Sequence, residues 1–292
     1  MLSLHTNAAA LSTQNSLSSS QKSLATSMTR LGTGYRVNSA MDDAAGLQIA
    51  TRLDAQTRGM AVAQRNTQNG ISMLQTGEGA LNEVSNILLR MKDLATEAFS
   101  ASSTATDKTA MQGEYDALGT ELTNIIKNTS FGGTQLFSDG ALITGAGGKM
   151  STAMSFQIGA SAGESMSVDV SGQLTALATA LGNVSKQYNA TPAAGAELSA
   201  TANTMLTTIG GAIDKVGELR ASFGAAANRL DHVYNNLQNM STNTSAAKGR
   251  IMDTDFAAES STMTTKQMLM QSGTAMLKQS NSMSGLVMSL LG

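Results

Sequence analysis

Two adjacent carboxylates, Asp42 and Asp43, are the residues whose types and spacing come closest to a reaction centre. They lie in the stretch RLGTGYRVNSAMDDAAG, residues 30–46. Paired carboxylates can divide general acid and general base work between them. Such a reaction would also need a nucleophile beside a base, a histidine or a set of metal ligands, and the stretch contains none of these. The sequence therefore predicts that the protein is not an enzyme.

Gly32 and Gly34 could be the start of a phosphate-binding loop. However, they follow a helical pattern, and no third glycine completes the motif. Glycine is also favoured just past the carboxyl end of a helix, because it adopts the left-handed backbone conformation without strain. We therefore expect the first helix to end at Gly32 and a flexible joint to follow.

Ser39 and Asp42 have the spacing of a capping box in front of the sequence AAGLQIATRL. An acid in the first turn also interacts favourably with the helix dipole. A second helix should therefore begin near Ser39. The stretch between the two helices would form a spoke, with four charged side chains available for contacts with other copies of the chain: Arg30, Arg36, Asp42 and Asp43.

The 292-residue chain lacks the residues on which most sites depend. It has no cysteine, which excludes disulfides, thiolate catalysis and thiolate-ligated metals. Its two histidines, His5 and His232, lie far apart in the sequence, so we expect no metal and no cofactor. A net charge of −2 provides no basic stripe for nucleic acid. No apolar run reaches the roughly 18 residues of a membrane span, and the first residues lack the pattern of a cleaved signal peptide.

Two pairs of heptad series predict long helices. In each half of the chain, apolar or small residues recur every seven positions, and a companion series follows three residues later, which is the pattern of a helical seam. The 19 methionines and the single proline are compatible with such helices. The series are Leu74, Leu81, Leu88 and Ala95 with Gly77, Val84, Met91 and Ala98, and Val216, Phe223, Leu230 and Leu237 with Leu219, Ala226, Val233 and Met240.

Shorter elements are predicted between the two long helices. One segment has helical spacing, two later segments alternate apolar and polar residues around GASAGE like a β-hairpin, and a weak helical pattern follows. The residues are Met111, Tyr115, Leu118, Leu122 and Ile125 for the helix, Phe156, Ile158, Met166, Val168 and Val170 for the hairpin, and Leu174, Leu177, Leu181 and Val184 for the weak pattern. We expect a mainly α fold, a long antiparallel helical bundle or coiled-coil rod with a small β-hairpin region. The alternative is an ordinary globular core of three amphipathic helices, but heptads sustained in step favour the rod.

Both ends of the chain have apolar series at a spacing of seven, set among Ser, Thr, Gln and Asn. Such polar residues provide few of the charge pairs that stabilise isolated helices. We expect both ends to be poorly ordered in the monomer and to become helical when many copies pack together. The predicted self-assembly seam consists of Leu17, Leu24, Met28, Leu31, Leu269, Met276, Met283, Val287 and Leu290.

Four segments resemble the N- and C-terminal signature blocks of bacterial flagellins. They are RLGTGYRVNSAMDDAAGLQIATRL, RNTQNGISMLQTGEGALNEV, FGAAANRL and SAAKGRIMDTDFAAESSTMTTKQMLMQSGTAML. The resemblance covers residues 1–140 and 209–292. It implies a structural subunit that self-assembles into the extracellular flagellar filament for motility. The short middle implies a minimal form without large outer domains, of the lateral, swarming kind.

The resemblance also implies a division of the chain into domains. The terminal helices would pair coaxially as an inner domain, formed by residues 1–42 with the spoke and by residues 251–292. A helical bundle domain would contain residues 43–175, including the hairpin, and residues 206–250. Residues 176–205 would be a short variable segment.

Further partners follow from the resemblance alone. Flagellins are exported unfolded by the flagellar type III apparatus without a cleaved signal peptide, and an export chaperone covers the C-terminal helix. Cap and hook-junction proteins lie at the two ends of the filament. A vertebrate toll-like receptor senses many flagellins on a patch that here would contain Arg90, Leu94 and Glu114. That surface also makes contacts between protofilaments, so a structural role for Arg90 is the favoured reading.

Two other classes of protein remain open from the sequence. A hook-filament junction protein has flagellin-like ends and a different middle. A type III secreted helical tip or translocator protein would also be helical, free of cysteine and exported without a signal peptide. A translocator would need an apolar hairpin long enough to enter a bilayer, and the sequence contains none.

Overall fold

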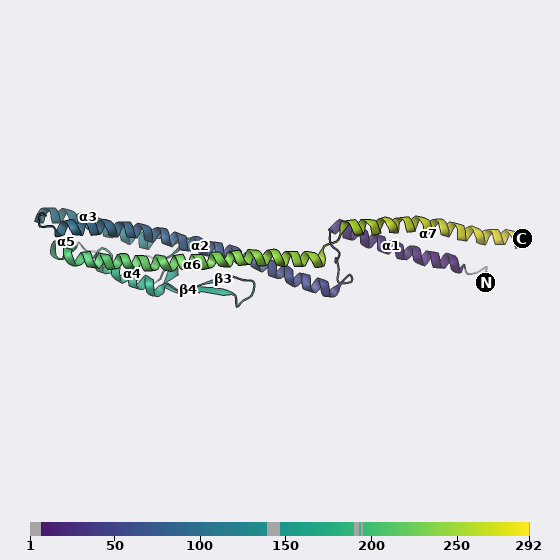
Figure 1. Ribbon diagram of the computed structural model, residues 1–292, viewed down its shortest axis with the longest axis horizontal. Coiled ribbons are helices and arrows are strands. Elements are labelled where there is room, and N and C mark those ends of the chain that lie inside the picture. The colour runs from purple at the N-terminus through teal and green to yellow at the C-terminus, as the bar shows by residue number, and fades with distance from the viewer. Residues whose placement is uncertain (1–6, 139–146, 190–192, 194, 292) are drawn as a thin grey trace. The chain divides into compact units, whose positions relative to one another are not determined.

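The computed structural model describes residues 7–138, 147–189, 193 and 195–291, without the side chains of Ala200 and of residues 284–291. His5 therefore lies outside the described residues. The chain folds as two compact units, one formed by the residues up to 57 and from 242 on, the other by residues 58–241. Within the described parts the secondary structure is mainly helical, with two small β-hairpins (Figure 1).

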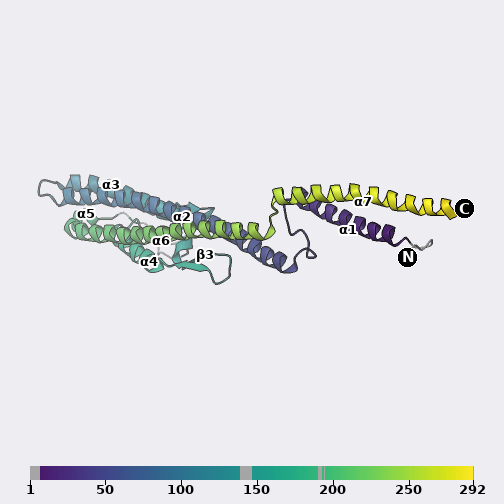
Figure 2. The same cartoon turned by 45° about the vertical axis from the view of Figure 1, so that its right-hand side comes forward.

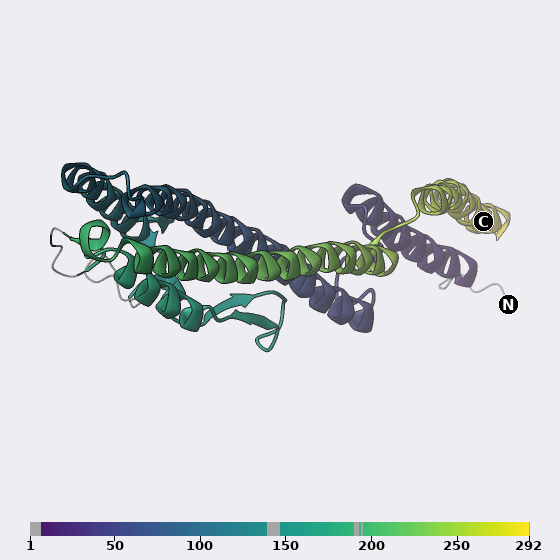
Figure 3. The same cartoon turned by 60° about the vertical axis from the view of Figure 1, so that its left-hand side comes forward.

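The unit of residues 58–241 is built on two long helices, α2 (Ala44–Phe99) and α6 (Ala202–Met252). They run antiparallel, because Gln64 Nε2 donates to Gln238 Oε1 at 3.1 Å, while Glu78, later in α2, lies 3.7 Å from Arg220, which comes earlier in α6. α3 (Ala105–Asn128) returns along α2, and α4 (Ser171–Val184) lies beside α6 (Figure 3). The unit is therefore a helical bundle closed by distant parts of the chain.

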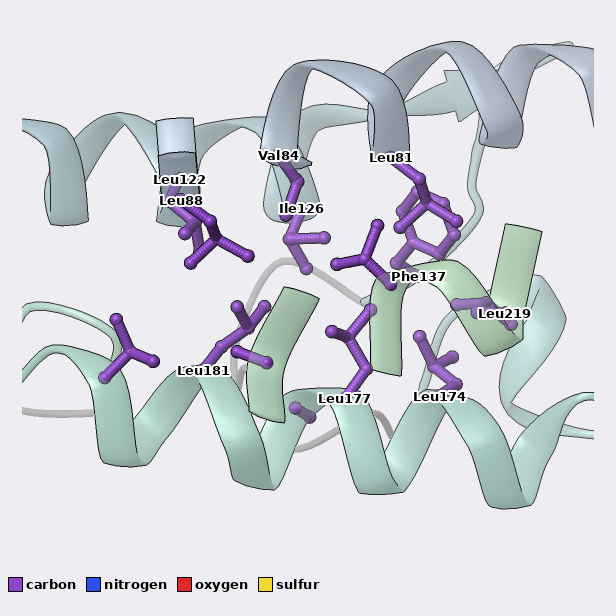
Figure 4. Close-up of a cluster of buried hydrophobic side chains, with 14 of the residues drawn as sticks. Leu81, Val84, Leu88, Leu122, Ile126, Phe137, Leu174, Leu177, Leu181 and Leu219 are labelled. Carbon is purple, nitrogen blue, oxygen red and sulfur yellow. The ribbon is translucent and has the colours of Figure 1, made fainter. Parts of the chain in front are cut away.

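The heptad series form the core of this bundle, as predicted. Leu81, Leu88 and Phe223 are among its most fully buried side chains. Figure 4 shows leucines of α2, α3, α4 and α6 pointing toward one another, with Phe137 beside Leu81 at one side of the cluster. The ring of Phe137 stacks on that of Phe223 with a centroid distance of 6.4 Å. The predicted seam is confirmed apart from its last position, because Met240 is exposed.

The predicted short helix is confirmed as α3, and the weak helical pattern that follows the hairpin is confirmed as α4. Tyr115 and Leu122 are buried, and the Tyr115 hydroxyl donates to the carbonyl oxygen of Val184 at 2.8 Å. This bond joins the middle of α3 to the last residue of α4. Burial, with nearby carboxylates as a smaller cause, raises the pKa of Tyr115 above its usual range, so the hydroxyl stays a donor.

The β-hairpin lies where the alternating pattern predicts it. β3 (Met154–Gln157) pairs antiparallel with β4 (Ser165–Val168), with Phe156 opposite Met166. The Phe156 ring lies over Gly70 of α2, where an added Cβ would be 3.0 Å from it. A second hairpin, β1 (Ser130–Phe131) with β2 (Thr134–Gln135), was not predicted. Its turn is the glycine pair 132–133, and both residues have positive φ.

A buried polar cluster near the short helix α5 (Glu197–Ala200) was also not predicted. Glu197 is 7% exposed and accepts from Gln112 Nε2 at 2.8 Å and from the amide of Lys186 at 3.0 Å. Gln112 Oε1 in turn accepts from the amide of Leu198 at 2.8 Å. The same Gln112 amide group donates to Asp116 at 2.8 Å. The cluster fastens Lys186, Glu197 and Leu198 onto α3. A turn of 3-10 helix at Lys149–Ser151 completes the unit.

The other unit pairs the terminal helices α1 (Ala8–Thr33) and α7 (Phe256–Leu291) (Figure 2). They run antiparallel, because Asn7 Nδ2 donates to Ser280 Oγ at 3.1 Å while Arg30 lies 3.7 Å from Glu259 at the opposite end. The predicted end of the first helix at Gly32 is wrong. The helix continues to Thr33, and Gly34 is the residue with φ 77° whose amide donates to the Arg30 carbonyl.

The predicted start of the second helix near Ser39 is also wrong. Asp42 accepts from the amides of Asn38 and Ser39 and from the Ser39 hydroxyl, and this closes a turn before the helix. α2 begins at Ala44 because Asp43 is its cap, with Asp43 Oδ1 accepting from the Gly46 amide at 2.8 Å.

Candidate assembly surfaces

One face of α1 is covered by α7 within the chain. Leu24 is 9% exposed and Ser27 is 3% exposed, while Leu17 and Leu31 are partly buried. Leu17 contacts α7 at Gly273, where an added Cβ would lie 3.5 Å from Leu17 Cδ1. These residues follow a spacing of seven, with Ser27 three residues after Leu24, as expected for a helix that packs along one seam. The leucine series of the N-terminal helix therefore stabilises the helix pair itself.

The predicted apolar series of α7 is exposed, unlike the leucine series of α1. Leu269, Met276 and Met283 are 50%, 63% and 56% exposed, although they repeat every seven residues. Among the side chains of α7 that the structure describes, the partly buried apolar ones are Met263, Met270 and Leu277, which form a second series of seven, one position further along the helix. On α1, Met28 is 53% exposed. We call the exposed set Leu269, Met276 and Met283 the α7 stripe.

The predicted seam therefore contains two kinds of residue. Leu17, Leu24 and Leu31 pack inside the chain, and Met28 with the α7 stripe stays exposed. Val287 and Leu290 belong to α7, but their side chains lie outside the described residues. Leu11 and Met268, which are 55% and 56% exposed, extend the exposed apolar surface and were missed, because neither belongs to the predicted series of seven.

A groove of about 350 Å³ lies between α1 and α7 beside the stripe. One wall consists of the hydroxyl side chains of Ser12, Ser16 and Ser20, spaced four residues apart on α1. Leu269 and Met276 of the stripe form the other wall. Small side chains allow another helix to approach closely. The groove and the stripe therefore form one surface, with a helical spacing of residues, on which another helix could pack.

The two connectors beside the helix pair are bound to each other. The Arg36 amide donates to the Met252 carbonyl at 2.6 Å, and its guanidinium donates to the Ile251 carbonyl at 2.9 Å. The Thr254 amide donates to the Gly34 carbonyl at 3.0 Å. Residues 34–36 and 251–254 are therefore paired, although more than 200 residues separate them in the sequence.

The four predicted spoke residues all have contacts inside the chain. Arg30 faces Glu259, Arg36 binds the Ile251 carbonyl, Asp42 closes its turn and Asp43 caps α2. The hydrogen bonds from Ser39 and Asn38 lower the pKa of Asp42, which keeps the carboxylate ionised. Contacts of these residues with other copies stay a prediction, and they would have to use the remaining lone pairs and donors.

The three residues of the predicted receptor patch do not share one surface. Arg90 and Glu114 are exposed and paired, with Arg90 Nη2 2.6 Å from Glu114 Oε1. The Glu114 carboxylate raises the pKa of the Arg90 guanidinium. Leu94 is 2% exposed and belongs to the bundle core, so its inclusion in a surface patch is wrong. Its place in a heptad-like helix is the signal that could have predicted burial.

Neither a metal site nor a membrane span is found within the part of the chain that the structure describes. No three His, Asp or Glu side chains there gather closely enough to hold a metal ion. No helix among the same residues is both long and apolar enough to cross a bilayer.

Comparisons with known proteins match both ends of the chain. The model of the bacterial flagellin N-terminal helical region matches residues 4–142, and that of the C-terminal helical region matches residues 206–291. Polar flagellin F of Vibrio parahaemolyticus is 33% identical and flagellin C of Vibrio cholerae is 32% identical, each over the whole length of both chains. The chain belongs to the bacterial flagellin family.

Two solved structures have similar parts. The crystal structure of Bacillus cereus flagellin is 34% identical, with a TM-score of 0.47 over 63% of this chain and 94% of that one. A putative flagellar hook-associated protein from Vibrio parahaemolyticus is 18% identical, with a TM-score of 0.45 over 73% of this chain and 97% of that one.

Proposed function

We propose that this chain is the structural subunit of a bacterial flagellar filament, an extracellular polymer that serves motility. Its membership in the flagellin family supports this function. The observation that carries the proposal is the α7 stripe, because an apolar series repeating every seven residues is left exposed after α1 and α7 have paired. Exposed apolar rows of this kind mark surfaces that another protein covers.

Other copies of the same chain are the partners that cover the stripe. Burying an apolar side chain completely contributes about 1.5 to 3 kcal/mol, so covering the exposed half of each stripe residue contributes roughly 1 kcal/mol per residue. Each copy would offer the stripe, with the groove that Leu269 and Met276 also line, to a different surface of the next copy. Contacts between unlike surfaces do not close on themselves, and an open helical polymer results.

The domain ranges predicted from the resemblance are part of the proposal. Residues 1–42 and 251–292 would form the inner domain of the filament, and the bundle would lie outside it, with residues 176–205 as a short variable segment. We also expect the terminal helices of the dilute monomer to be only weakly protected. Hydrogen exchange of residues 8–30 and 260–283 in the monomer and in the polymer would test this expectation directly.

Export and the other filament proteins are also part of the proposal. An exposed apolar stripe on α7 requires cover before assembly, which suits an export chaperone at the C-terminal helix. Export would proceed without a cleaved signal peptide, and cap and hook-junction proteins would lie at the two ends of the polymer.

We propose a structural role for the Arg90–Glu114 pair in preference to toll-like receptor binding, because the pair joins α2 to α3. A lateral flagellum is the proposed site of use.

The experiment is seeded polymerisation of the wild type and two variants, followed by sedimentation. Leu269→Asp places a charge on the α7 stripe, and Gln271→Asp places the same charge on another side of α7. We expect the wild type and Gln271→Asp to sediment as polymer and Leu269→Asp to stay in the supernatant. Normal polymer from Leu269→Asp would contradict the role of the stripe, and an inert wild type would contradict the function.

A further inference from the structure

Two oppositely charged stripes lie on the bundle and are not explained by its fold. On α2, Arg58 and Arg65 are exposed and seven residues apart, and the exposed Val62 lies between them on the same helical face. Arg65 makes no hydrogen bond or ion pair with any residue that the structure describes. Arg58 also has a contact inside the chain. We call these residues the basic stripe.

The second stripe is on α3. Asp107, Glu114 and Glu121 are all exposed and follow one another at intervals of seven. Seven residues of α-helix rise about 10.5 Å, so neighbouring charges have the same spacing along both stripes. Among these three carboxylates, Glu114 is the one that forms an ion pair with a basic residue that the structure describes, Arg90.

The two stripes cannot meet within one copy. The pair Arg90–Glu114 fixes which part of α2 lies beside the middle of α3. Arg65 precedes Arg90 by 25 residues of continuous helix, which corresponds to about 38 Å along α2. Because α3 runs back along α2, Glu121 lies about 10.5 Å nearer to Arg65 than Glu114 does, which still leaves about 27 Å. This distance far exceeds the 4 Å of an ion pair, so any contact between the stripes requires two chains.

We propose that the basic stripe of one copy docks against the acidic stripe on α3 of a second copy. The inference rests on the proposed function, since it describes one contact between subunits of the polymer. Opposite charges at equal spacing support this partner, and a contact between two different surfaces of the same chain extends a polymer in one direction.

The register that the structure favours pairs the basic stripe with Glu114 and Glu121. The Asp107 carboxylate is occupied by the Thr104 amide and hydroxyl at 2.9 and 2.7 Å. Both bonds from Arg90 end on Oε1 of Glu114, which leaves its Oε2 to accept another donor. The hydrogen bond that Glu121 accepts, from Asn124, is long at 3.5 Å. Val62 would then be covered by α3 of the second copy.

The test measures the elongation rate of wild-type seeds by wild-type chain, Arg65→Glu, Glu121→Arg and the double variant. Circular dichroism of each monomer checks that these exposed substitutions leave the fold intact. Lys127→Glu is the control, because it changes the net charge as Arg65→Glu does but lies on α3 outside the stripe. Each rate is measured at low salt and at 0.3 M salt, where exposed charges are largely screened.

We expect each single variant to elongate at least tenfold more slowly than the wild type at low salt, and the double variant to recover most of the rate. The deficits should shrink at 0.3 M salt, and Lys127→Glu should elongate normally. If single and double variants elongate like the wild type, or the double variant adds both deficits, the contact is wrong while the filament function stands. If wild-type chain does not elongate at all, the proposed function itself fails and the contact with it.

Discussion

Leu89 and Leu94 provide a matched test of which residues of α2 belong to the core. Leu94 is 2% exposed and Leu89 is 49% exposed, and both lie on the same helix. Truncating a fully buried leucine to alanine costs about 3 to 5 kcal/mol, because the lost burial is combined with a cavity. Truncating a half-exposed leucine should cost within about 1 kcal/mol.

Thermal unfolding of the monomer, followed by circular dichroism at 222 nm, measures this difference. A domain of this size shifts its midpoint by about 2 to 4 °C for each kcal/mol, so Leu94→Ala should lower the midpoint by about 6 to 20 °C. Leu89→Ala should lower it by a few degrees at most. Equal shifts for the two variants, or a silent Leu94→Ala, would refute the packing described for α2.

Three further predictions concern single side chains. Gln112→Leu removes the donor to Glu197, and urea unfolding should show a loss of about 2 to 3 kcal/mol. Gly77→Leu overfills the space beside Phe223, and the same assay should show a loss of about 1 to 3 kcal/mol. Hydrogen bonds from Thr104 lower the pKa of Asp107, so the stability this carboxylate contributes is present above its ordinary pKa and lost as the pH falls through the lowered one. Asp107→Ala should therefore melt at a lower temperature than the wild type at pH 7, and this difference should shrink as the pH falls below the ordinary pKa of aspartate.

The long helices could be predicted from the sequence because their pattern is repeated many times. Leu81, Leu88 and Phe223 belong to series that recur every seven residues, and a series of that length has few other interpretations. Met240 is exposed although it continues the same series, because a heptad only indicates which face could be buried. Whether a partner covers that face depends on the rest of the fold.

The helix ends were harder to predict, because one spacing has two outcomes. Ser39-x-x-Asp42 and Thr104-x-x-Asp107 have the same form, yet only Thr104 begins a helix with a reciprocal capping box. At the first site a second acid, Asp43, follows immediately and becomes the cap. Which of two adjacent acids, Asp42 or Asp43, caps the helix depends on the backbone direction at the end of the preceding turn.

The assembly surfaces could be predicted only in part. The spacing of Leu269, Met276 and Met283 indicated an apolar face, but the sequence could not tell that Leu17 and Leu24 would face α7 while this series stays exposed. Which of two neighbouring heptad positions faces the partner helix is set by side-chain fit along the whole pair. The bond between Gln112 and Glu197 was hidden for a simpler reason, since 85 residues separate them and neither belongs to a motif.

Electron microscopy of the purified wild-type chain, after addition of short filament seeds, tests the central claim most directly. The account predicts long filaments of uniform width that grow from the seeds. Chain that stays dispersed, or that stops at short rings, would contradict the assignment as a filament subunit.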